Sequence, residues 1–136
     1  MSTLDIKKYK TVITYLVISV LMIAIDKVYA IFGHGVSSRY MDWMFLFPLI
    51  GGALFYLLLG FIIPDAGKAA GYRLFFNLHN SGIALFTVAS FLQGICEIAG
   101  TNSPYVLYYN ILGGAFIAVG LVQLIMIGKK VLLTKE

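Results

Sequence analysis

Four apolar stretches, each long enough to cross a lipid bilayer, account for most of this chain of 136 residues. They cover residues 12–32, 44–63, 74–99 and 105–127, and short polar segments separate them. About 20 helical residues span the hydrocarbon core, because each residue advances the helix by ~1.5 Å. The sequence therefore predicts an all-α integral membrane protein, in which residues 1–136 form one antiparallel four-helix transmembrane bundle.

The charge distribution supports this fold class and predicts the topology. Charged residues make up 12% of the chain, against ~25% in a typical soluble domain. The net charge of +4 comes from Lys and Arg at the ends of the apolar stretches, so it does not indicate a nucleic-acid partner. Most of these residues flank the two termini and the second loop. The positive-inside rule therefore predicts cytoplasmic N- and C-termini, and we expect a plasma membrane, the inner or cell membrane of a prokaryote.

Two of the apolar stretches contain interruptions that bear on their structure. In the first, the charged pair Asp26 and Lys27 argues against cleavage as a signal peptide, so we expect this stretch to remain as a span. In the second, Pro48, Gly51 and Gly52 predict a kink or a close helix contact. Because glycines in the second and fourth stretches would let helices approach closely, we consider a homodimer through these two spans.

Polar residues line one face of the third stretch and one face of the first. Hydrocarbon cannot hydrogen-bond these groups, so each stripe must face other helices, a water-filled cavity or a ligand. At ~100° per residue, the stripe of the third stretch consists of His79, Ser90, Gln93 and Glu97. The stripe of the first stretch consists of Tyr15, Ser19, Asp26 and Tyr29.

The outer ends of three stretches place polar groups at one depth, which predicts a site. Asp26, Gln93 and Asn110 each lie roughly 8–9 Å below the expected outer boundary. Carboxylates and aromatic rings both attract cations, so we expect an outward-facing pocket that binds, and could transport, a small cationic or lipid-like ligand. The expected ligand-binding residues are Asp26, Gln93, Glu97, Asn110, Tyr29, Tyr108 and Arg39, under a lid formed by the first loop with His34, Arg39 and Asp42. The alternative is structural: Asp26 pairs with Lys27 or Arg39, and the amides join helices.

A second polar group lies near the cytoplasmic end of the third stretch. It consists of Arg73, Asn77, His79 and Asn80. An arginine with neighbouring amides at this depth could bind the phosphate of a membrane lipid. The simpler interpretation, which we favour, is an arginine reaching the interface beside a histidine that bonds a backbone carbonyl.

The sequence offers little for catalysis. The two histidines, His34 and His79, lie at opposite ends and cannot share a haem iron, and Cys96 has no second cysteine. Phosphate-binding loops and nucleophile motifs are also missing, so we expect no cofactor and no metal site, and we favour a protein that is not an enzyme. Two alternatives stay open: an accessory subunit of a larger membrane complex, and a lipid-modifying enzyme that uses Asp26 and Glu97 as acid and base.

Overall fold

The computed structural model describes residues 3–63 and 66–135, and the side-chain surroundings of residues 9–63 and 66–133. The described residues are helical and contain no strand. Four of their helical segments are long and apolar enough to cross a membrane, as predicted, and they indicate a membrane protein. The elements are α1 (Thr3–Phe32), α2 (Arg39–Asp42), η1 (Phe47–Leu54), α3 (Phe55–Ile62), η2 (Ala66–Lys68), α4 (Tyr72–Ala99) and α5 (Tyr105–Lys135).

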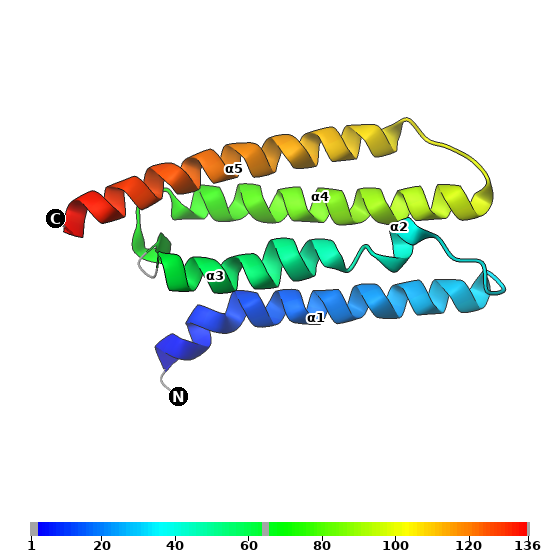
Figure 1. Ribbon diagram of the computed structural model, residues 1–136, viewed down its shortest axis with the longest axis horizontal. Coiled ribbons are helices and arrows are strands. Elements are labelled where there is room, and N and C mark those ends of the chain that lie inside the picture. The colour runs from blue at the N-terminus through cyan, green and yellow to red at the C-terminus, as the bar shows by residue number, and fades with distance from the viewer. Residues whose placement is uncertain (1–2, 64–65, 136) are drawn as a thin grey trace.

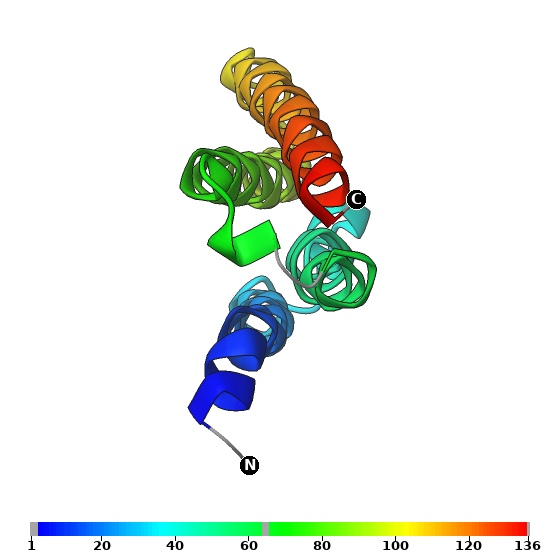
Figure 2. The ribbon, with the colours of Figure 1, turned by 90° about the vertical axis from the view of Figure 1, so that its left-hand side faces the viewer.

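The long segments run antiparallel, and the two outermost helices do not meet (Figure 1). α5 packs along α4, while η1 packs along α1. Figures 1 and 2 place α1 and α5 at opposite edges of the bundle, with α4 and the η1–α3 segment between them. We call the end with residues 33–38 and 100–104 the loop end, and the end with η2 and the last turns of α5 the termini end.

The second apolar segment is not one straight helix. It begins with the short α2, where the backbone N–H of Tyr40 donates to Oγ of Ser38 at 3.3 Å. Residues 43–45 form a turn, and the chain continues through the π-helix η1 into α3. Pro48 lies at the start of η1 and has no backbone N–H to donate. The predicted irregularity in this stretch is confirmed.

Glycines allow the helices to approach closely within the chain. A side chain at position 52 would place its Cβ 2.3 Å from two ring carbons of Tyr15, so only glycine fits here. At Gly52 the second apolar segment therefore makes the close helix contact that the sequence predicted. A Cβ at position 82 would lie 2.4 Å from Cγ1 of Ile117 and 2.9 Å from the carbonyl oxygen of Gly113. Gly52 of the second stretch and Gly113 of the fourth therefore make close contacts inside the bundle.

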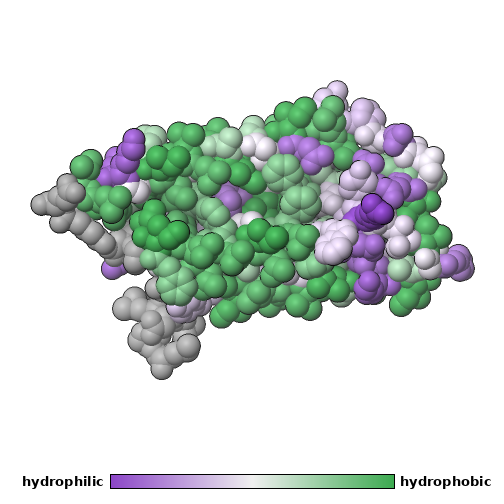
Figure 3. All heavy atoms as spheres, viewed as in Figure 1, coloured by the Kyte–Doolittle hydropathy of each residue, from purple (hydrophilic) through white to green (hydrophobic). Residues whose placement is uncertain are grey.

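The surface is apolar along the helices and polar at the loop end. In Figure 3, hydrophobic residues cover most of the length of the bundle, and hydrophilic residues gather over α2 and the neighbouring loops. This distribution fits helices that expose their sides to lipid and their connections to water.

Candidate functional site

The polar stripe of α1 faces the interior of the bundle. Tyr15, Ser19 and Asp26 expose only 8%, 4% and 4% of their surface, and Tyr29 is half-buried. Of the three surroundings expected for this stripe, other helices are the one that the structure shows. Its two ends have different partners, which divides the polar interior into a group near the loop end and a group nearer the termini end.

Near the loop end, two carboxyl groups from different helices meet. The carboxyl group of Asp42, on α2, lies beside that of Asp26. Asp26 is only 6% exposed in its side chain, and its Oδ2 lies 3.3 Å from Nζ of Lys27, whose side chain is 70% exposed. We call these three residues, Asp26, Lys27 and Asp42, the acidic site.

The acidic site exists because α2 folds back onto α4. Oγ of Ser90 donates to the backbone oxygen of Tyr40. Met41 is 1% exposed and packs against Gly94, where a Cβ would lie 3.0 Å from Cβ of Met41. These contacts hold α2 in place, and Asp42 at its end reaches the buried carboxyl of Asp26. Of the residues expected to form a lid, Asp42 lies at the acidic site, whereas His34 and Arg39 are exposed.

The charges of the acidic site do not balance when both carboxyl groups are ionised. Lys27 compensates one carboxylate, and one negative charge is left over. Two neighbouring carboxylates repel each other, and a shared proton or a bound cation between them lowers this repulsion. Aromatic rings lie close by. Tyr29, one turn beyond Asp26, contacts Phe91 of α4 edge-on, with the two ring centroids 6.4 Å apart.

The other expected ligand-binding residues lie on several helices, and those on α5 are separated from Asp26. Gln93 is half-buried on α4, whereas Arg39 and Glu97 are exposed. Asn110 and Tyr108 are exposed on α5, at the opposite edge of the bundle from α1 (Figure 2). The expected convergence of polar groups from three spans is wrong in this respect, because α5 packs along α4 and cannot reach α1. The structure also pairs Asp26 with Asp42 rather than with Glu97, the partner expected for a lipid-modifying enzyme.

Nearer the termini end, three polar side chains join three helices. The hydroxyl groups of Tyr15 and Tyr56 each donate to Oδ1 of Asn80 at 2.6 Å. The two tyrosine rings stack with their centroids 5.8 Å apart. Because these residues come from α1, α3 and α4, the group fixes the relative positions of the helices in the half of the bundle farther from the acidic site.

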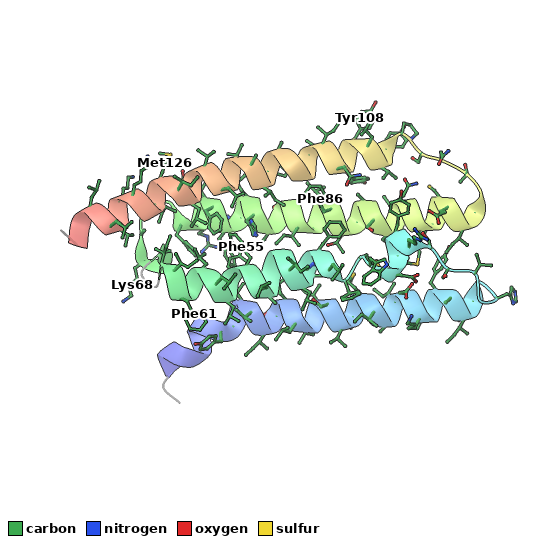
Figure 4. The ribbon with its side chains drawn as sticks, in the orientation of Figure 1. Phe55, Phe61, Lys68, Phe86, Tyr108 and Met126 are labelled. Atoms are coloured by element: carbon green, nitrogen blue, oxygen red, sulfur yellow. The ribbon has the colours of Figure 1, made fainter. Side chains whose placement is uncertain are left out.

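His79 lies beside this group, within an aromatic cluster. Its Nε2–H donates to the backbone oxygen of Gly51 in η1 at 2.8 Å. Its ring stacks on that of Phe55, with the ring centroids 4.2 Å apart. The preferred interpretation of the histidine, a bond to a backbone carbonyl, is confirmed. Nδ1 of His79 is buried and has no hydrogen-bond partner in the described part of the chain. Figure 4 shows Phe55 pointing into the space between α3 and α4.

The predicted cytoplasmic cluster is therefore divided. His79 and Asn80 point inward, whereas Arg73 and Asn77 are exposed on α4. An inward histidine and amide serve helix packing, and only the two exposed residues remain free to contact lipid or another helix.

His79→Phe is expected to lower the free energy of unfolding by about 1–3 kcal/mol, the cost of a buried carbonyl left without its donor. Phenylalanine keeps the ring stacked on Phe55 but cannot donate to Gly51. Unfolding in detergent, followed by circular dichroism, measures the change. Asn110→Leu, at an exposed position, is the control and should not destabilise the protein. Equal stability of His79→Phe and the parent would show that this bond contributes nothing.

Comparisons with known protein families, with curated proteins and with solved structures found no match. The functional argument therefore rests on the side chains described above. Among them, Asp42 is the site residue that we left out of the expected binding set, having assigned it to the lid alone. Ser38, a preferred N-cap residue, could have indicated that a helix begins at residue 39, but it gives no signal that Asp42 lies beside Asp26.

Proposed function

We propose that the protein is a small multi-pass protein of the plasma membrane that binds a small or lipid-like ligand with a positive charge at the loop end. The observation that carries the proposal is the buried Asp26 carboxyl, which lies beside Asp42 and is compensated only in part by Lys27. The proposed orientation places both termini in the cytoplasm, and it is supported by the basic residues Lys68, Arg73 and Lys129 at the termini end. The loop end then faces outward.

Ligand binding at this site exchanges a proton for a cation. With both carboxyl groups ionised, Asp26, Asp42 and Lys27 carry a net charge of −1, and with one shared proton they carry none. A monovalent cation restores neutrality equally well, so it competes with the proton for the second carboxylate. The aromatic contact of Tyr29 and Phe91 supplies a further attraction for an organic cation.

Native mass spectrometry tests this proposal with tetraphenylphosphonium, a lipophilic cation, as the probe. The parent protein is expected to retain the probe, and Asp26→Asn is expected to lose it, because the amide cannot supply the second negative charge. Glu97→Gln removes an exposed carboxylate outside the acidic site, so this control should retain the probe. Equal retention by all three proteins, or loss in Glu97→Gln alone, would refute the proposal.

A further inference from the structure

Lys27 is the exposed member of the acidic site. Its side chain is 70% exposed, whereas that of Asp26 is 6% exposed, and Nζ of Lys27 lies 3.3 Å from Oδ2 of Asp26. The two residues are neighbours in α1, so the lysine stays beside the buried carboxyl whatever the position of α2. Because the lysine side chain is mostly exposed, its charge can be removed without repacking the interior.

The charge of Lys27 acts on both carboxyl groups. Its Nζ pairs with Asp26, and the lysine is also close enough to attract the carboxylate of Asp42. Arg39, the other base that the sequence offered as a partner for Asp26, is exposed on α2. A positive charge held this close to two carboxylates belongs to the net charge that a bound ligand has to balance.

We infer that Lys27 determines the valence of the cation that the acidic site accepts. With Lys27 in place and both carboxyl groups ionised, a single positive charge on the ligand neutralises the site. A second positive charge would be left without a partner and would be repelled by Nζ of Lys27. Without the lysine, two negative charges remain, and a dication neutralises them. Lys27 thus excludes dications by repulsion, although the two carboxylates alone would attract them.

This inference rests on the proposed cation binding and narrows its ligand class to monovalent organic cations. Among residues 9–63 and 66–133, no group of three His, Cys, Asp or Glu side chains is placed to hold a metal ion. The comparison that tests the role of Lys27 is therefore between an organic monocation and an organic dication.

Two probes with the same molecular frame isolate the effect of ligand charge. Methyl viologen is a dication of two joined pyridinium rings, and methyl-phenylpyridinium is the monocation in which one of these rings is a phenyl. Equilibrium dialysis in detergent solution measures the affinity for each. The parent protein is expected to bind the monocation at least about tenfold more tightly than the dication. Lys27→Gln should reverse this order, because it removes the repelling charge and keeps both carboxyl groups.

Two further variants serve as controls. Lys27→Arg returns the positive charge and should restore the preference for the monocation. Lys68→Gln removes an exposed lysine at the termini end, so it changes the net charge of the protein equally and should bind both probes as the parent does.

The outcomes separate this inference from the proposed function. If the parent binds the monocation and Lys27→Gln keeps the same preference, the inference is overturned while the cation site stands. A parent that prefers the dication, or loss of both probes in Lys27→Gln, would also overturn it, the latter by showing that Lys27 is needed for the site itself. Failure of the parent to bind either probe would overturn both the inference and the proposed cation binding.

Discussion

Gly52→Ala is expected to lower the free energy of unfolding by roughly 1–3 kcal/mol, a large effect for one added methyl group. The new Cβ would lie 2.3 Å from two carbons of the Tyr15 ring. That ring cannot simply move away, because it stacks on Tyr56 and its hydroxyl bonds Asn80. The substitution therefore strains η1 or breaks the contacts that join three helices. Thermal unfolding in detergent measures the loss.

Gly114→Ala provides the matched control within a helix. A Cβ at position 114 would meet only the Phe86 ring, at an ordinary distance of 3.8 Å. Since alanine is favoured over glycine in helices by about 1 kcal/mol, this substitution should be neutral or stabilising. If Gly52→Ala and Gly114→Ala had the same effect, the close packing of η1 on α1 would not contribute to stability in the way described here.

The four segments long enough to span a membrane and the inward polar face of α1 could be predicted from the sequence, because both depend on local patterns. Span length follows from runs of apolar residues, and the face of a helix follows from its period. The positions of Tyr15, Ser19 and Asp26 on one face were sufficient to predict their burial, whichever helix covered them.

The lateral arrangement of the helices could not be predicted in the same way. Asp26 and Asn110 lie at similar depth, but depth does not determine which helices are neighbours. That choice depends on backbone contacts such as the approach of Gly82 to Gly113, which holds α5 along α4 and away from α1. A glycine pattern in the sequence is equally compatible with contacts inside one chain and between two chains.

The position of Asp42 depends on a similar long-range contact. Sequence alone assigns residues 33–42 to a loop and cannot show that the loop folds back. In the structure, Met41 packs against Gly94 and Ser90 bonds the Tyr40 carbonyl, fifty residues apart in the chain. These contacts, rather than any local preference, bring Asp42 to the Asp26 carboxyl.

Asp42→Asn is expected to weaken tetraphenylphosphonium binding as severely as Asp26→Asn, by at least about tenfold. The electrostatic attraction between a monovalent cation and a carboxylate about 4 Å away is ~4 kcal/mol at an effective dielectric constant of 20. Either variant keeps only one carboxylate, and Lys27 already compensates its charge. The double variant leaves the charge of Lys27 uncompensated, so it should bind more weakly than either single variant. Parent-like binding by either single variant would show that the cation does not need both carboxylates, and Glu97→Gln should again bind as the parent does.

The most direct measurement is proton release on cation binding, followed with a pH indicator in weakly buffered detergent solution. The proximity of the Asp26 and Asp42 carboxyl groups predicts that the parent releases about one proton per tetraphenylphosphonium bound, because proton and cation compete for one carboxylate. Asp26→Asn and Asp42→Asn should release none. Binding by the parent without proton release, or unchanged release in either variant, would contradict an exchange of proton for cation at the acidic site.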